Sequence, residues 1–217
     1  MRRRGSLVGG VLMLILVPAA RAVPVEEIVR QVQNRYDTTK DFTAHVQQEL
    51  IVASTGQTLT ATGEVAFKRP GKMNWKLEGP DEQLIVADGT VLWLYQKEEQ
   101  QVLKAPFQSA FRSTTPISFL TGVGRIADDF EVTLAGIGEH EVYLDLRPRR
   151  TDAEFGRLRL IINTSTSDIV GAEVRDPVGN VTKLRFTELR RNVGLPDSRF
   201  TFAVPPGVDI IEVPIGY

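Results

Sequence analysis

Cysteine is absent from the 217-residue chain, and histidine occurs only twice. Without cysteine the chain has no disulfide framework, no thiolate nucleophile and no thiol to carry a lipid. His45 and His140 each stand alone, with no second ligand or nucleophile at a usable spacing, so both are predicted to face solvent. Patterns typical of nucleotide-binding, zinc-protease and serine-hydrolase sites are also missing. The sequence therefore predicts no catalytic site, no metal and no cofactor.

Acidic side chains are plentiful but not paired in a catalytic pattern. Asp128-Asp129 and Glu98-Glu99 are adjacent in sequence, and neighbours in a strand point to opposite faces. With 27 acidic residues, two carboxylates distant in sequence can still meet across a cleft. A hydrolase built on such a pair stays an alternative, although no motif points to it.

Long apolar runs are lacking except near the start. Arg2, Arg3 and Arg4 precede the run from Leu7 to Val17, and Ala20-Arg21-Ala22 follows it. This order is typical of a secretory signal peptide, and the run is shorter than the roughly 20 residues that span a bilayer. We predict a cleaved signal peptide at 1–22 and one mature domain at 23–217.

Removal of that segment changes the charge of the chain. Its four arginines leave with it, so the formal net charge falls from −1 to −5. A negative protein of this size has no electrostatic reason to bind nucleic acid or anionic lipid surfaces. The Ala20-Arg21-Ala22 ending and the lack of a cysteine to carry a lipid favour a protein free in a bacterial periplasm, and we expect it to be a monomer.

Hydrophobic periodicity then divides the mature chain. Apolar residues at helical spacing between Val25 and Tyr36 predict an amphipathic helix. From Phe42 the period changes to two, and about eleven such segments follow, mostly joined by short turns. Residues 105–129 break the alternation with prolines and glycines yet stay rich in apolar residues, which predicts short covering helices. The pattern favours one large antiparallel sheet, curled or barrel-like.

Such a sheet carries more apolar side-chain surface than a single layer can readily bury. A curled sheet that is only partly covered by helices can enclose a ligand-sized apolar cavity. A completely filled, inert core satisfies the same periodicity, so both interpretations stay open at this point.

The block around the two tryptophans resembles a known family. Lys68-Arg69-Pro70, Met73-Asn74-Trp75, Ile85-Val86-Ala87-Asp88-Gly89 and Val91-Leu92-Trp93-Leu94-Tyr95 are similar to the signature region of the LolA family of periplasmic lipoprotein carriers. Weaker similarity follows in the correct order to Phe200-x-Phe202 and Pro205-Pro206-Gly207-Val208.

The resemblance implies a mainly β fold with an α-helical lid: an incompletely closed antiparallel half-barrel of about eleven strands whose concave hydrophobic face is covered by helices. It implies a chaperone that is not an enzyme. The chaperone takes lipoproteins from an inner-membrane ABC transporter to an outer-membrane acceptor, with the acyl chains in its cavity. The expected lining residues are Phe67, Met73, Trp75, Leu77, Trp93, Phe119 and Leu120. Which tryptophan faces the cavity is left open.

Arg69 takes the role of a latch in this resemblance, because the family's arginine at that place bonds lid groups and holds the empty protein closed. A guanidinium has five donors and suits that role. Met73 departs from the family, which often has an aromatic residue there, so a function that needs a flat ring is not carried over. A related half-barrel that binds another amphiphile, or senses lipids or lipoproteins in envelope stress, is the second interpretation.

Overall fold

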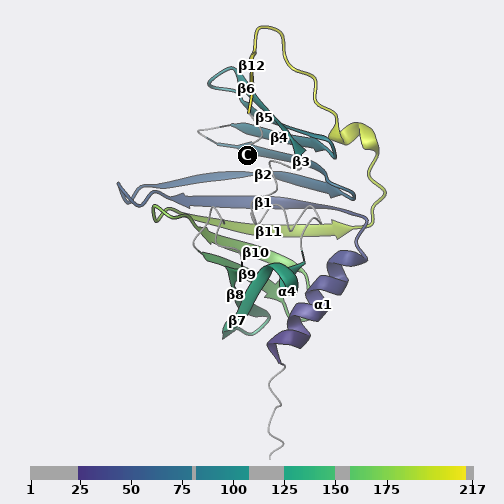
Figure 1. The fold of residues 1–217 in the computed structure, drawn as a ribbon, viewed down its shortest axis with the longest axis vertical. Helices are drawn as coiled ribbons and strands as arrows, with labels where there is room; N and C mark the ends of the chain where they lie inside the picture. Colours follow the sequence, from purple (N-terminus) through teal and green to yellow (C-terminus); the bar gives the residue numbers. More distant parts are fainter. Residues whose placement is uncertain (1–23, 80–81, 108–124, 150–156, 214–217) are drawn as a thin grey trace, which may run out of the picture.

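One sheet forms most of the molecule. The computed structural model describes residues 24–79, 82–107, 125–149 and 157–213, and within them the chain forms a 12-stranded sheet (Figure 1). In chain order the strands are β1 (Asp41–Ile51), β2 (Thr58–Lys68), β3 (Lys72–Glu78), β4 (Gln83–Asp88), β5 (Val91–Gln96), β6 (Gln101–Pro106), β7 (Phe130–Ile137), β8 (Glu141–Pro148), β9 (Arg157–Asn163), β10 (Ile169–Arg175), β11 (Val181–Arg191) and β12 (Asp209–Glu212). The helices are α1 (Val25–Asp37), α4 (Ile126–Asp129) and the 3₁₀ helix η1 (Asp197–Phe200).

The strand order leaves two free edges. Across the sheet the order is β12-β6-β5-β4-β3-β2-β1-β11-β10-β9-β8-β7, and β12 beside β6 is the one parallel pair among the described strands. In that part of the chain β7 and β12 end the sheet without pairing to each other, so the sheet does not close into a barrel. The predicted incompletely closed antiparallel sheet is confirmed.

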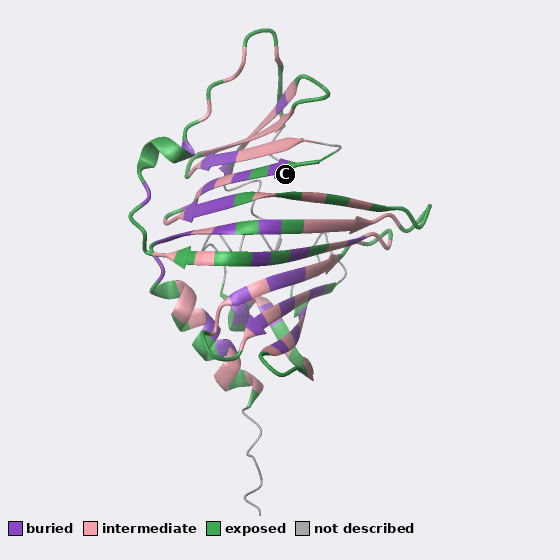
Figure 2. Cartoon of the chain, turned by 180° about the vertical axis from the view of Figure 1, so that it is seen from behind, coloured by how far each residue is buried: buried purple, intermediate pink, exposed green. Residues whose placement is uncertain are grey.

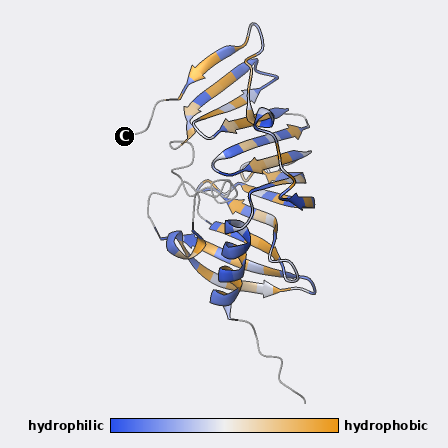
Figure 3. Ribbon diagram, turned by 90° about the vertical axis from the view of Figure 1, so that its right-hand side faces the viewer, coloured by the Kyte–Doolittle hydropathy of each residue, from blue (hydrophilic) through white to orange (hydrophobic). Residues whose placement is uncertain are grey.

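Strand pairing sorts the side chains onto two faces. We call the face that carries Phe67, Met73 and Trp75 the core face, and the face that carries Ala66 and Trp93 the outer face. Alternation of hydrophobic and hydrophilic residues runs along the strands (Figure 3). The main hydrophobic cluster lies on the core face and includes Val29 and Val32 of α1 and Ile126 of α4.

Both described α-helices lie at the β7 end of the sheet (Figure 1). The α1 helix buries Val29 and Val32, as its apolar stripe predicts, and carries acidic residues in its first turn, where they favour the helix dipole. The Thr38 hydroxyl donates to the Asn34 carbonyl oxygen at 2.9 Å and helps to end the helix. The opposite end of the sheet, with β12, has neither helix against it (Figure 1).

The strand count differs by one from the expectation of about eleven. The eleven expected segments correspond to β1 to β11, and the addition is β12 in the tail, for which the sequence shows no period. All four residues of β12 are exposed, so no alternation of buried and exposed positions marks the strand. It is held by pairing to β6 rather than by burial of one face.

Candidate functional site

Four of the predicted lining residues meet on the core face. Phe67 of β2 lies opposite Met73 of β3, and Trp75 and Leu77 follow Met73 at two-residue spacing on the same face. Met73 is 0% exposed and Trp75 2%. The Phe67 and Trp75 rings pack edge to face with centroids 6.1 Å apart, and Trp75 makes the same contact with Phe186. The sequence block thus forms a continuous aromatic floor in the middle of the sheet.

Burial decreases from this floor toward β12. Trp75 lies opposite Ile85 of β4, and the same register continues through Leu94, Leu103 and Ile211. We call these four aliphatic residues, Ile85, Leu94, Leu103 and Ile211, the open row. Ile85, Leu94 and Leu103 are half-buried, and Ile211 is 45% exposed. Figure 2 shows this decrease in burial: all residues of β5 have the colour of intermediate burial.

The outer face holds the second tryptophan. Trp93 lies opposite Val86, and its ring centroid is 6.2 Å from that of Phe202, which also contacts Tyr95 at 6.1 Å. Because Trp93 stands between Leu92 and Leu94, the alternation of the strand turns it away from the core face. The structure does not bring Trp93 together with the other predicted lining residues, so we remove it from that set.

Other predictions fall outside the described residues. Phe119 and Leu120, the predicted lid at Thr115-Pro116 and the predicted signal peptide at 1–22 all lie there. Phe107 is the last described residue before the gap, and it packs on the turn that follows Arg69-Pro70. A Cβ on Gly71, whose φ is +65°, would lie 2.8 Å from the Phe107 ring, so only glycine leaves room there.

Arg69 follows the last residue of β2 and lies near the C-terminal end of α1. Its backbone N–H donates to the Lys40 carbonyl oxygen at 2.9 Å, and its half-buried side chain lines a small cleft with Tyr36 and Phe67. Burial raises the pKa of the Tyr36 hydroxyl, the Asp168 carboxylate raises it further, and the Arg69 guanidinium lowers it. Arg69 is therefore a cation at the border between the aromatic floor and the C-terminal end of α1. Its latch role stays a prediction.

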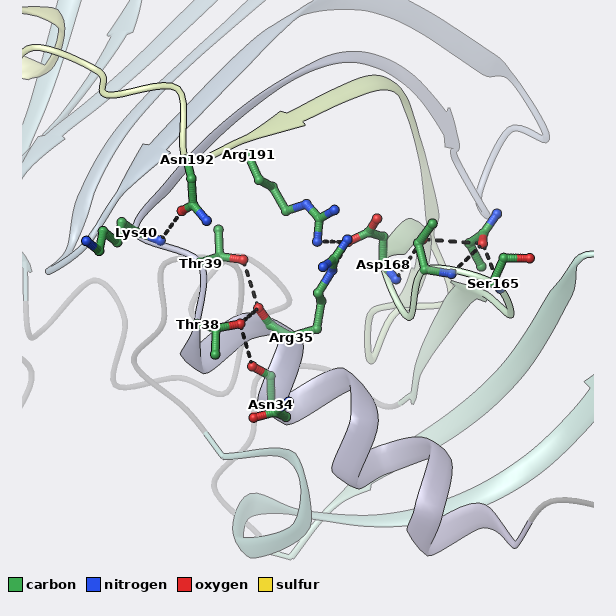
Figure 4. A network of polar contacts seen from close by, with 11 residues as sticks. Asn34, Arg35, Thr38, Thr39, Lys40, Ser165, Asp168, Arg191 and Asn192 are labelled. Carbon is green, nitrogen blue, oxygen red and sulfur yellow. Dashed lines mark hydrogen bonds and ion pairs between the residues drawn. The ribbon is translucent and has the colours of Figure 1, made fainter.

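A charged network next to Arg69 holds α1 on the sheet (Figure 4). The Asp168 carboxylate accepts from Arg35 Nε at 3.1 Å and pairs with Arg191 Nη1 at 2.9 Å, with its own side chain only 12% exposed. The Thr39 hydroxyl donates to the Arg35 carbonyl oxygen at 2.8 Å. No pattern in the sequence points to this network, since its charged members lie 133 and 23 residues apart along the chain without a motif.

A groove of about 460 Å³ lies between α1 and the β7 edge. Its apolar floor is formed by Val25, Val29, Phe130 and Val132, and charged residues such as Arg30 surround it. Arg30 is already engaged by Glu27 through two hydrogen bonds. The groove therefore joins the covered end of the core face to solvent.

Groups for catalysis or metal binding do not gather in the part of the chain that the structure describes. No cluster of three or more histidine, cysteine, aspartate or glutamate side chains there suits a metal ion. His45 and His140 are exposed, as predicted. Among the same residues, no helix has the length and apolar character needed to cross a membrane.

Comparison with known proteins decides the family. The family model described as outer membrane lipoprotein carrier protein LolA matches residues 37–203, which run from the end of α1 past η1. The chain belongs to the LolA family. An outer-membrane lipoprotein carrier protein of Dechloromonas aromatica is 31% identical over 84% of this chain and 86% of its own length. One of Legionella pneumophila (strain Corby) is 28% identical over 92% of this chain and 97% of its own.

Solved structures support the architecture of this LolA-family chain. An uncharacterized conserved protein from Thermus thermophilus has a similar fold, with a TM-score of 0.55 over 87% of this chain and 98% of that protein. The two share 14% sequence identity, so the likeness concerns the fold alone.

Within the LolA-family chain, the signature block occupies β2 to β5. Lys68-Arg69-Pro70 forms the end of β2 and the turn into β3, and the Asp88-Gly89 pair begins the turn between β4 and β5. The Asp88 carboxylate accepts from the backbone N–H groups of Thr90 and Val91, and Gly89 has a φ of +99°. The block therefore builds the aromatic floor and the first half of the open row.

Proposed function

We propose that this protein is a periplasmic chaperone that binds the acyl chains of lipoproteins on its core face and carries them from the inner to the outer membrane. Membership of the LolA family and the curated relatives named as outer-membrane lipoprotein carriers support this function. The single structural observation that carries it is the open row, an apolar strip that leads from an exposed sheet edge to a buried aromatic floor.

Burial of a hydrocarbon chain supplies the binding energy in this proposal. Each CH₂ group removed from water contributes about 0.8 kcal/mol, so one C16 chain supplies on the order of 10 kcal/mol before the costs of ordering. The side chains of the open row are aliphatic, and nothing charged interrupts their register from Ile85 to Ile211. Such a strip receives an alkyl chain without leaving a buried polar group unpaired.

Membership of the family supports the following route and partners for the proposed carrier. The signal peptide at 1–22 directs the chain to the periplasm, and residues 23–217 act there as one monomeric carrier domain. An inner-membrane ABC transporter releases the lipoprotein to the carrier, and an outer-membrane acceptor receives it. Nucleic acid is not a partner.

Arg69 serves as the latch of the empty carrier. Arg69 lies beside Tyr36 in the last turn of α1 and beside Phe67 of the aromatic floor. This position supports the role, because a movement of the Arg69 side chain would change the contact between the end of α1 and the floor. Since the guanidinium carries several donors, it can hold the empty form closed and release it when the acyl chain enters.

A transfer assay tests the function. The purified mature protein, residues 23–217, is mixed with a triacylated lipoprotein and separated by size exclusion, and the complex is then added to membranes that contain the acceptor. We expect a soluble one-to-one complex that disappears as the lipoprotein enters the membrane.

The matched control is the same cargo with its lipid-modified cysteine replaced by serine, which has no acyl chain to bury. Equal complex formation with acylated and unacylated cargo would show that the acyl chains are not what the protein binds. Tight binding of free lipid alongside failure with every lipoprotein would instead indicate a carrier of another amphiphile.

A further inference from the structure

We propose that a row of glutamine side chains beside the open row binds the polar head of the ligand, the ester or amide groups that join its acyl chains to the rest of the molecule. We call Gln83, Gln96 and Gln101 the amide row. The inference rests on the proposed function and specifies how the ligand lies: its head is at the amide row, and its hydrocarbon covers the open row.

The amide row lies on the core face, parallel to the open row. Gln96 of β5 is opposite Gln83 of β4 on one side and Gln101 of β6 on the other. Residues two apart along a strand share a face, and Gln96 is two residues from Leu94. Side chains directly opposite each other on neighbouring strands have Cβ atoms about 5 Å apart, so the three carboxamides form a continuous band. One step of two residues, about 7 Å, separates this band from the open row.

Exposure alone does not explain why this row is polar. Along β5 the core face carries Gln96, Leu94 and Leu92, and all three are half-buried. Strand β6 repeats this order, with an amide followed by two aliphatic side chains at the same intermediate burial. On β3 the row continues as Leu77, which is 4% exposed. The amides therefore begin where the sheet face opens, and they border the apolar strip on the side of the turn between β5 and β6.

The chemistry of the row suits an uncharged head. Each carboxamide has two donors and an acceptor oxygen, so it can bond ester and amide carbonyls as well as amide N–H groups. The ions next to the row neutralise each other, because Lys97 Nζ lies 2.7 Å from the Glu82 carboxylate. Asp209, opposite Gln101 at the exposed edge, disfavours an anionic head such as that of a free fatty acid.

This orientation gives each part of the ligand a matching environment. From the amide row the hydrocarbon runs along the strands over the open row toward Ala105 and Phe107, of which Phe107 is 6% exposed. The carbonyl groups at the head meet donors instead of an apolar surface that would leave them unpaired. Because the amide row is half-buried, the rest of the molecule beyond the head continues into solvent.

Calorimetry with a lysolipid tests the role of the amides. The probe is 1-myristoyl-lysophosphatidylcholine below its micellar concentration, titrated into the mature protein. Gln96→Leu should weaken binding about fivefold, the effect of one lost neutral hydrogen bond. A row that only borders the strip would give the opposite sign, because leucine extends the apolar surface and would tighten binding.

Gln47→Leu is the matched control, since Gln47 is exposed on the outer face and should leave the affinity unchanged. A measurement on the unmutated protein covers the case in which Gln96→Leu does not fold. Lysolipids that carry a nitroxide near the head or near the methyl end of the acyl chain broaden the NMR signals of nearby protons. The label near the head should broaden the side-chain amide signals of the amide row more strongly than the label near the methyl end.

Two results would overturn the inference and leave acyl binding standing. One is unchanged or tighter binding by folded Gln96→Leu, and the other is stronger broadening of the amide row by the label at the methyl end. Failure of the lysolipid to bind the unmutated protein would contradict acyl binding on the core face, and the inference with it.

Discussion

The two ends of the core face differ in burial although both are apolar. Toward β7 and β8, Leu144, Leu146 and Leu158 are almost completely buried, and α1 and α4 pack on the same cluster. Toward β12, the open row is half-buried or exposed, with no described helix against it. The first end therefore acts as the scaffold that stabilises the sheet, and the second keeps the surface that a ligand covers. The predictions below test this division.

The largest effect should come from a cavity in the scaffold end. Leu144 is 0% exposed, so Leu144→Ala should lower the free energy of unfolding by about 3 kcal/mol. The matched variant Leu94→Ala, in the half-buried row, should cost clearly less. Urea denaturation of both variants measures the difference. Equal losses in the free energy of unfolding would contradict the proposed division into a stabilising end and a ligand-binding end.

The Asp168 network should have the next largest effect. Asp168→Asn removes the charge that Arg35 and Arg191 share, so the free energy of unfolding should fall by about 2 kcal/mol. Asp128→Asn is the control, because its pair with Arg125 is exposed and should contribute well under 1 kcal/mol. Similar effects from the two changes would argue against a role of the network in fixing α1.

How much of the fold and of the candidate site the sequence predicts depends on whether a feature leaves a periodic pattern in the sequence. Period-two alternation of apolar residues in the sequence located β1 to β11, whereas β12 has no such alternation, is exposed at all four residues and escaped detection. Trp75 and Trp93 look alike in sequence, since strand alternation does not say which set of side chains faces the core. The Asp168 network depends on tertiary contacts among distant polar residues, for which the sequence carries no period.

A charge placed on the open row should act on binding rather than on folding. Leu103→Glu puts a carboxylate where an acyl chain would bury it, so lipoprotein affinity should fall at least about tenfold. Lys104→Glu, one residue along on the outer face, is the control and should bind almost normally. Unaltered binding by Leu103→Glu would exclude the open row from the site.

Removal of the latch should have a smaller, kinetic effect. Arg69→Leu should weaken the closed empty form, so the complex retains its lipid longer and transfer to acceptor membranes slows by on the order of a few-fold. Arg190→Leu serves as the control, because that arginine is exposed and lies 3.9 Å from Glu188. Transfer at the normal rate in Arg69→Leu would remove Arg69 from the mechanism.

The smallest effect should be a pH dependence on the outer face. Hydrogen bonds from Lys68, and then from Lys72, lower the pKa of Asp197 to about 2. Because the pKa is lower in the folded state, this stabilisation is present above about pH 4 and is lost as the pH falls toward 2. The stability difference between the protein and Asp197→Asn should therefore shrink over that range. A difference that stays constant from pH 5 to 2 would contradict the assignment.

Photo-crosslinking at two adjacent positions tests the central claim most directly. Leu94 lies on the core face and Tyr95 on the outer face of the same strand, and both are half-buried. A photoreactive amino acid is placed at each position, and the carrier is loaded with lipoprotein that bears labelled acyl chains. We predict that position 94 crosslinks to the acyl chains and position 95 does not. Crosslinking at 95 with none at 94 would contradict it.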